Sequence, residues 1–99
     1  MDKVSRREVR NLDETIAEFI VPRLKKFMEE TDSIPEYNQL ILKKTGERVP
    51  FSREEYMVVL QEMIDGFNEK IIHDIADVDM KKVNRALELF CCYYNSLWI

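Results

Sequence analysis

The sequence predicts a single all-α domain over residues 1–99, built as a small bundle of three main helices. A chain of 99 residues has the usual length of one domain and buries one core. Hydrophobic residues make up 45% of it and charged residues 34%, which is the composition of a globular protein. Only two Gly and three Pro are present. These are too few turn formers for a fold of many strands, so long helices joined by few connections are expected.

The clearest predicted helix begins after Ser52 and runs to about Ile72. Ser52 and Glu55 match the capping box S-x-x-E, in which each side chain accepts a hydrogen bond from the other residue's backbone amide. Gly66 lies inside this helix at a cost of about 1 kcal/mol relative to Ala, so we expect another element to cross closely there. The hydrophobic side predicted to face the core contains Tyr56, Met57, Leu60, Met63, Ile64, Phe67 and Ile71.

A C-terminal helix is predicted after Asp77 or Asp79, since either residue is a suitable N-cap. Ala86, Leu89 and Tyr93 widen its hydrophobic stripe along one edge. We expect Leu89, Tyr93 and Ile99 to stay partly at the surface. Aromatic residues left at a surface favour protein interfaces, so self-association or binding of a protein partner is expected. The stripe predicted to face the core contains Met80, Val83, Leu87, Phe90, Cys91, Tyr94, Leu97 and Trp98.

The first main helix is predicted from a hydrophobic pattern that continues through Pro22, which is expected to kink or divide it. A short fourth helix over residues 36–44 would begin with a capping box at Ser33 and end at Gly46, but the run 40–42 suits a short extended segment equally well. The pattern of the first helix consists of Leu12, Ile16, Phe19, Ile20, Leu24, Phe27 and Met28.

Charge is unevenly distributed along the chain. The formal net charge of −4 divides into +2 for residues 1–26, −1 for 27–53 and −5 for 54–99. The carboxylates after Ser52 collect on the side of the helix away from the core, and such an acidic ridge could compete with nucleic acid for a basic groove of another protein. The residues predicted to bind this partner are Glu55, Glu62, Asp65, Glu69, Leu89 and Tyr93.

The alternative function is nucleic-acid binding through the basic N-terminal segment. Lys3, Arg6, Arg7 and Arg10 share one face if this segment is helical, and phosphate contact is the chemistry that such a group would support. An ordinary solvated arm explains the same residues, because acidic neighbours dilute the charge and no interleaved aromatic residues offer base stacking.

Catalysis is not indicated, and we expect no cofactor and no metal. Asp65, Glu69, His73 and Asp77 recur every fourth residue and could offer metal ligands, but a solvated polar face explains the same spacing. The sequence has no P-loop, nucleophile elbow or paired-cysteine zinc spacing. Its two cysteines, at 91 and 92, are adjacent and suit packing in a reducing cytoplasm. No signal peptide or membrane span is expected.

The stretch from about Arg53 to Trp98 resembles small helical proteins encoded by tailed phages and prophages. The resemblance covers about half of the chain, although those sequences often carry Trp at the position of Tyr56. It implies a phage accessory protein in a bacterial cytoplasm, in the company of proteins that bind and disable host factors, including anti-CRISPR proteins, and it assigns no functional residue. The segments that carry it are the helix with Leu60, Met63, Ile64 and Phe67, then Ala86-Leu87-Glu88-Leu89-Phe90, Tyr93-Tyr94 and Leu97-Trp98.

Overall fold

The computed structural model describes residues 3–99, and the regular secondary structure of this range is helical, which confirms the predicted all-α class. Apart from one isolated bridge between Tyr37 and Pro50, the described chain contains no β-structure. Within residues 3–99 there are five α-helices and two 3-10 turns, so the structure adds the short helix α1 to the elements expected. The elements are α1 (Arg6–Arg10), α2 (Leu12–Glu30), α3 (Gln39–Thr45), α4 (Arg53–Ile72), η1 (Ile75–Asp77), α5 (Met80–Tyr93) and η2 (Tyr94–Ser96).

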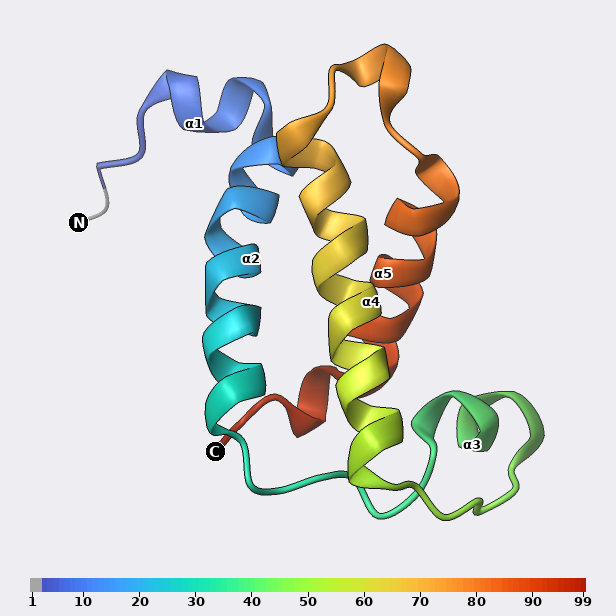
Figure 1. The fold of residues 1–99 in the computed structure, drawn as a ribbon. Helices are drawn as coiled ribbons and strands as arrows, with labels where there is room; N and C mark the ends of the chain where they lie inside the picture. Colours follow the sequence, from blue (N-terminus) through green and yellow to red (C-terminus); the bar gives the residue numbers. More distant parts are fainter. Residues whose placement is uncertain (1–2) are drawn as a thin grey trace.

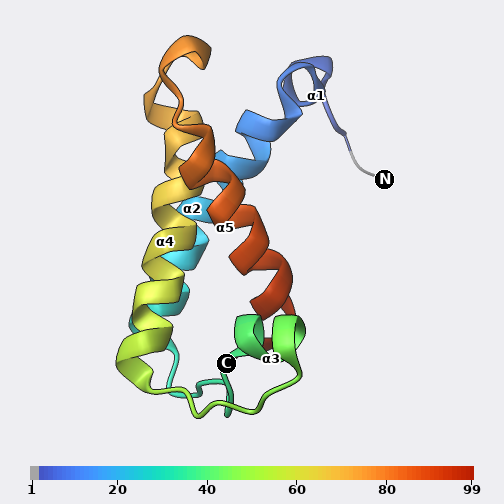
Figure 2. The ribbon, with the colours of Figure 1, turned by 90° about the vertical axis from the view of Figure 1, so that its right-hand side faces the viewer.

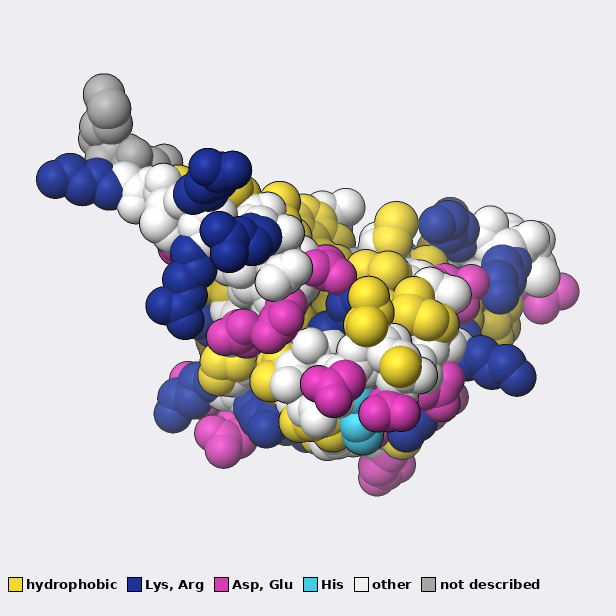
Figure 3. Space-filling view, turned by 90° about the horizontal axis from the view of Figure 1, so that it is seen from above, with side chains coloured by type: hydrophobic (Ala, Val, Ile, Leu, Met, Phe, Trp, Pro, Cys, Tyr) yellow, Lys and Arg dark blue, Asp and Glu magenta, His cyan; other side chains and the backbone are white. Residues whose placement is uncertain are grey.

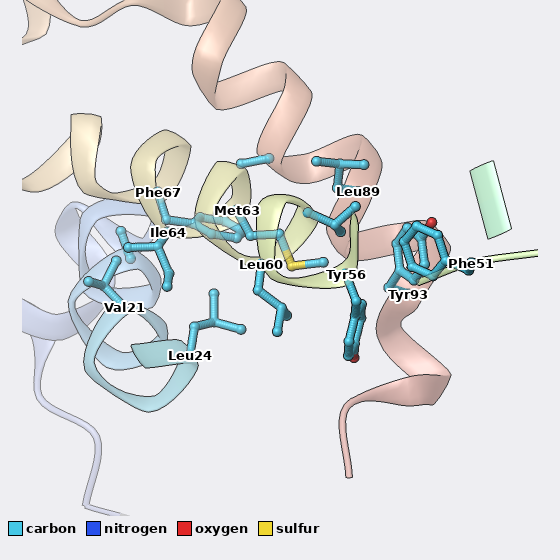
Figure 4. Packing of buried hydrophobic residues seen from close by; sticks show 13 residues of the cluster. Val21, Leu24, Phe51, Tyr56, Leu60, Met63, Ile64, Phe67, Leu89 and Tyr93 are labelled. Atoms are coloured by element: carbon cyan, nitrogen blue, oxygen red, sulfur yellow. The ribbon is translucent and has the colours of Figure 1, made fainter. Parts of the chain in front are cut away.

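Helix α4 is central, with α2 packed along one side of it and α5 along another (Figure 1). Seen from the side, α5 crosses α4 obliquely and the two helices diverge toward the end where α3 packs on α5 (Figure 2). Helix α1 branches away from the start of α2 and buries none of its residues. The buried side chains of α2, α4 and α5 therefore meet in one hydrophobic cluster around α4 (Figure 4).

The prediction for α4 is confirmed at its start and along its core side. The Ser52 amide donates to Glu55 Oε1 at 3.0 Å, and the Glu55 amide donates to Ser52 Oγ at 3.1 Å. Because α4 packs against two helices, its buried surface is wider than the predicted arc and also takes in Val59. The predicted core residues that are fully buried are Tyr56, Leu60, Met63, Ile64 and Phe67.

Gly66 marks the place where α5 crosses α4, as expected. A Cβ atom at Gly66 would lie 2.3 Å from the carbonyl oxygen of Lys82 and 2.4 Å from the Cβ of Ala86. Both distances are far below van der Waals contact, so only glycine allows the two helices to approach this closely.

Helix α5 is rotated relative to the predicted stripe. Asp79 is its N-cap, and the Asp79 side chain accepts hydrogen bonds from the amides of Lys81 and Lys82. The expectation that Leu89 and Tyr93 lie at the surface is wrong, because they are 1% and 0% exposed. These two side chains pack into the core because their edge of α5 faces α4 (Figure 4).

The other edge of α5 faces outward. Tyr94 and Trp98 were expected in the core but are mostly exposed, and Cys91 is exposed rather than packed. Phe90 lies between the two edges, half-buried, with its ring centroid 5.6 Å from that of Phe67 and 5.6 Å from that of Tyr94. The period of the stripe is therefore confirmed, and Val83 is buried as predicted. The buried side of α5 is nevertheless turned toward the edge with Leu89 and Tyr93, which leaves Met80 and Leu87 about half exposed.

Helix α2 shows a similar rotation. It runs through Pro22 as one undivided helix, from Leu12 to Glu30. It packs on α4 through its buried residues Ala17, Val21 and Leu24. Three residues expected in the core are instead about half exposed, namely Leu12, Ile16 and Phe19.

The segment for which the sequence allows either a short helix or an extended conformation is the helix α3. It begins three residues later than the predicted helix. Asn38 caps it, because its side chain accepts a hydrogen bond from the Ile41 amide at 2.9 Å, and Ser33 does not act as the cap. Gly46 ends the helix with a φ of 77°, the left-handed conformation expected for glycine at this position. The buried Tyr93 hydroxyl accepts a hydrogen bond from the Gln39 amide at 3.2 Å, which joins α3 to α5.

Candidate protein-binding surface

The predicted acidic ridge on α4 is interrupted by intramolecular contacts. Glu55 is engaged in the capping box, and Asp65 accepts a hydrogen bond from Gln61 at 2.8 Å. Glu62 lies 3.7 Å from Arg85, a residue of α5. Helix α5 therefore brings a basic residue alongside a ridge that is acidic in the sequence of α4 alone.

Glu69 belongs to the interior rather than to a binding ridge, because it is only 7% exposed. Its Oε1 accepts a hydrogen bond from the Asp79 amide at 2.9 Å, and its Oε2 lies 3.6 Å from His73 and 3.9 Å from Lys82. Glu69 therefore ties the end of α4 to the start of α5. Together with the burial of Leu89 and Tyr93, this removes three of the six predicted partner-binding side chains from the surface.

The polar face around His73 does not form a ligand set for a metal. Among residues 3–99, no three His, Cys, Asp or Glu side chains gather closely enough to hold an ion. His73 pairs with Glu69, while Asp65 is engaged with Gln61 one turn earlier. In the folded chain, the four-residue spacing thus brings His73 next to the buried Glu69 and leaves Asp65 with a separate partner, so these side chains do not converge.

A different exposed surface lies on the turn between α4 and α5. Ile75 is 92% exposed there, and Ile72 and Met80 are each more than half exposed. Asp74 and Asp77 stand exposed beside these hydrophobic residues. We call Ile72, Asp74, Ile75, Asp77 and Met80 the turn surface. Figure 3 looks down on this end of the molecule and shows hydrophobic and acidic side chains side by side.

Local hydrogen bonds give the turn a defined shape. The Asp77 amide donates to the Asp74 carbonyl at 2.8 Å, which closes the 3-10 turn that carries Ile75. The contact from Glu69 to the Asp79 amide holds the other end of the turn. Ile75 is consequently presented to solvent on a turn that hydrogen bonds hold at both ends.

A groove of about 310 Å³ adjoins the turn surface, between this turn and the start of α2. Its polar wall contains Lys70 and Asp13, whose Nζ and Oδ2 atoms are 2.6 Å apart, and Ile75 forms part of its apolar wall. The hydrogen bond from Lys70 lowers the pKa of the Asp13 carboxyl below its ordinary value. A partner that covers Ile75 would therefore meet both apolar and charged groups.

Three basic residues of the alternative function, Arg6, Arg7 and Arg10, lie on α1, and Lys3 precedes this helix. Lys3, Arg6, Arg7 and Arg10 are all exposed. Figure 3 shows basic side chains gathered over this end of the chain, at a distance from the turn surface. A capping box between Ser5 and Glu8 begins the helix.

Comparison with protein-family models, with curated proteins and with solved structures finds no match to this chain. Over residues 3–99, no helix combines the length and the apolar character needed to cross a membrane. The turn surface was not predicted, because residues 72–80 have no helical period. The available signal was that hydrophobic residues alternate with Asp in a segment too short to bury them.

Proposed function

We propose that this protein acts by binding another protein through the turn surface, without catalysis and without a cofactor. The observation that supports this function is the 92% exposure of Ile75 on an ordered turn, beside Ile72 and Met80. Hydrophobic residues grouped at a surface are typical of interaction sites. The neighbouring carboxylates of Asp74 and Asp77 favour a partner whose apolar pocket has a basic rim.

The free energies expected from apolar burial and from exposed charges favour Ile75 as the main contact. Fully burying an isoleucine side chain contributes about 2 kcal/mol, and nearly all of this side chain is available to a partner. Exposed carboxylates contribute less affinity, but they steer a basic partner toward the surface and make association sensitive to salt. We therefore expect affinity to depend chiefly on Ile75 and the association rate on the two aspartates.

The setting proposed for this activity follows from the resemblance to phage proteins. In a bacterial cell the partner would be a host protein. A basic groove that normally holds nucleic acid would suit an acidic surface with a hydrophobic residue at its centre. Inhibition of a host defence or nucleic-acid-processing protein, in the manner of an anti-CRISPR protein, is the function we propose for such binding.

Affinity capture with matched variants tests the proposal. Tagged wild-type protein, Ile75→Ser and the control Val58→Ser would each be incubated with bacterial lysate, and the retained proteins identified by mass spectrometry. Val58 is a suitable control because it is 60% exposed on α4 and lies outside the turn surface. We expect a partner that the wild type and Val58→Ser retain equally, and that Ile75→Ser loses at least about tenfold in affinity. Equal retention by Ile75→Ser would refute the role of the turn surface.

Nucleic-acid binding is the second candidate, supported by the basic side chains gathered on α1. Fluorescence anisotropy with labelled DNA and RNA would show binding that weakens steeply as salt is raised. Arg6→Glu with Arg7→Glu would abolish it, whereas Arg48→Glu, at an exposed site on the α3–α4 loop, would have a smaller effect. Absence of binding at low salt would dismiss this candidate.

A further inference from the structure

Residues 3–10 form an exposed segment that the rest of the chain does not cover. The capping box between Ser5 and Glu8 orders α1, yet no residue of this helix is buried. Val4 and Val9 are 63% and 51% exposed, although both are hydrophobic. Figure 1 shows α1 standing clear of α4 and α5. We call residues 3–10 the N-terminal arm; its side chains are ordered by the helix and open to a second molecule.

One side of the N-terminal arm combines two cations with a hydrophobic residue. Arg6 and Arg10 are four residues apart and so share one side of α1, and Val9, three residues after Arg6, lies next to them. Glu8 lies on the opposite side of the helix, where it completes the capping box. Among residues 3–99, neither Arg6 nor Arg10 forms an ion pair. The charge on this side is therefore not neutralised within the described chain.

The turn surface has the complementary composition. The N-terminal arm carries four basic residues and one acidic residue, a net charge of +3, whereas residues 72–80, with His73 neutral, carry three aspartates and no Lys or Arg, a net charge of −3. Asp74 and Asp77 are exposed beside Ile75, and neither forms an ion pair within residues 3–99. Figure 3 shows the basic and the acidic groups at the same end of the molecule, apart from each other. One copy thus presents both halves of a complementary contact, which do not meet within it.

From this complementarity we propose that two copies of the chain pair by this end, with the N-terminal arm of each copy on the turn surface of the other. A two-fold axis midway between the arm and the turn forms both contacts at once, and a two-fold interface requires such a self-complementary surface. The two arginines of the arm then face Asp74 and Asp77 of the second copy, and Val9 adjoins its Ile75. A pairing of arm with arm would place like charges together, so the charge distribution selects the exchanged arrangement.

This pairing rests on the turn surface of the proposed function and adds its regulation. Paired copies cover Ile75, so a protein partner has to compete with the second copy. Each contact consists of one short helix and one turn, which makes the association weak and dependent on protein concentration. Raised salt weakens it further, because exposed charges are screened. At low protein concentration the chain is then a monomer with a free turn surface.

Sedimentation equilibrium at low and high salt tests the pairing. We expect the wild type to dimerise with a dissociation constant that rises with salt. Arg6→Glu with Arg10→Glu should raise the dissociation constant by on the order of tenfold or more, because it gives the arm a net negative charge. Lys43→Glu with Arg48→Glu is the matched control, since it changes the net charge equally at exposed sites in and after α3, at the other end of the molecule, and it should dimerise as the wild type does. A wild type that stays monomeric at every concentration, or an arm variant that dimerises normally, would overturn the proposal.

A mixture of complementary variants tests the exchanged arrangement. Asp74→Lys with Asp77→Lys should dimerise poorly by itself, because a basic arm then meets a basic turn. Mixed with the Arg6→Glu, Arg10→Glu variant in equal amounts, it restores both contacts, since each arm meets a turn of opposite charge. Native mass spectrometry should therefore detect more heterodimer than either homodimer, and circular dichroism should show the same helix content in both variants. A mixture without heterodimers would overturn the exchanged arrangement.

Affinity capture from bacterial lysate separates this pairing from the proposed function. The Arg6→Glu, Arg10→Glu variant keeps the whole turn surface, so it should retain a partner bound through Ile75 at least as well as the wild type does. Weaker retention by this variant than by the Lys43→Glu, Arg48→Glu control would overturn the competition between partner and second copy. Absence of any captured partner would contradict the proposed function alone, whereas a monomeric wild type would contradict the pairing alone.

Discussion

At the scale of single residues, Gly66 sets the distance between α4 and α5. We predict that Gly66→Ala lowers the free energy of unfolding by about 1–3 kcal/mol, although Ala is the better helix former by about 1 kcal/mol. The added Cβ would meet the backbone oxygen of Lys82 at 2.3 Å, and a helix backbone cannot move aside as a flexible side chain does. Urea denaturation followed by circular dichroism measures the change.

The control for this substitution is Gln61→Ala on the exposed side of the same helix. It removes one hydrogen bond to Asp65 at the surface and introduces no clash, so it should change stability by less than about 1 kcal/mol. If Gly66→Ala were as stable as the wild type, α5 would not be held at this distance from α4.

At the scale of elements, α4 shows what the sequence could predict and α2 and α5 show what it could not. Hydrophobic period identifies a helix and its apolar arc, and capping residues fix its start, which is why Ser52 and the core side of α4 were identified correctly. When the apolar arc of a helix is wider than the surface that one neighbouring helix covers, the sequence does not reveal which part of the arc faces the core. In α5 the edge with Leu89 and Tyr93 is buried and the edge with Tyr94 is exposed, because the approach at Gly66 determines how α5 is rotated.

Capping boxes begin both α1 and α4, and these two helices contribute differently to the core. Ser52→Ala should lower the free energy of unfolding by about 1 kcal/mol, because it removes an N-cap from the helix that forms the centre of the core. Ser5→Ala removes the same kind of cap from α1, which buries no residue, and should leave global stability almost unchanged. Parallel chemical denaturation of the two variants gives the comparison. An equal loss in both would mean that α1 is as strongly coupled to the core as α4 is.

At the scale of the whole molecule, the candidate site depends on which elements the fold brings together. The acidic residues of α4 form a ridge on an isolated helix, but packing of α5 places Arg85 3.7 Å from Glu62 and Lys82 3.9 Å from Glu69. No pattern within one helix reports the charges of its neighbour. The exposure of Ile75 likewise follows from the way the turn is held between α4 and α5. The pattern of hydrophobic residues in this short segment does not predict that exposure.

The last prediction concerns the independence of α1 from the rest of the fold. Deletion of residues 1–10 should lower the melting temperature by less than about 4 °C, which corresponds to less than about 1 kcal/mol for a domain of this size, because no residue of α1 is buried. The shortened chain should also keep any partner captured through Ile75 and lose any salt-sensitive binding of nucleic acid, since Arg6, Arg7 and Arg10 are removed. Thermal melting, affinity capture and anisotropy measure the three outcomes. A large drop in melting temperature would show that α1 stabilises the helical core, and loss of the captured partner would place the contact on α1 instead of the turn surface.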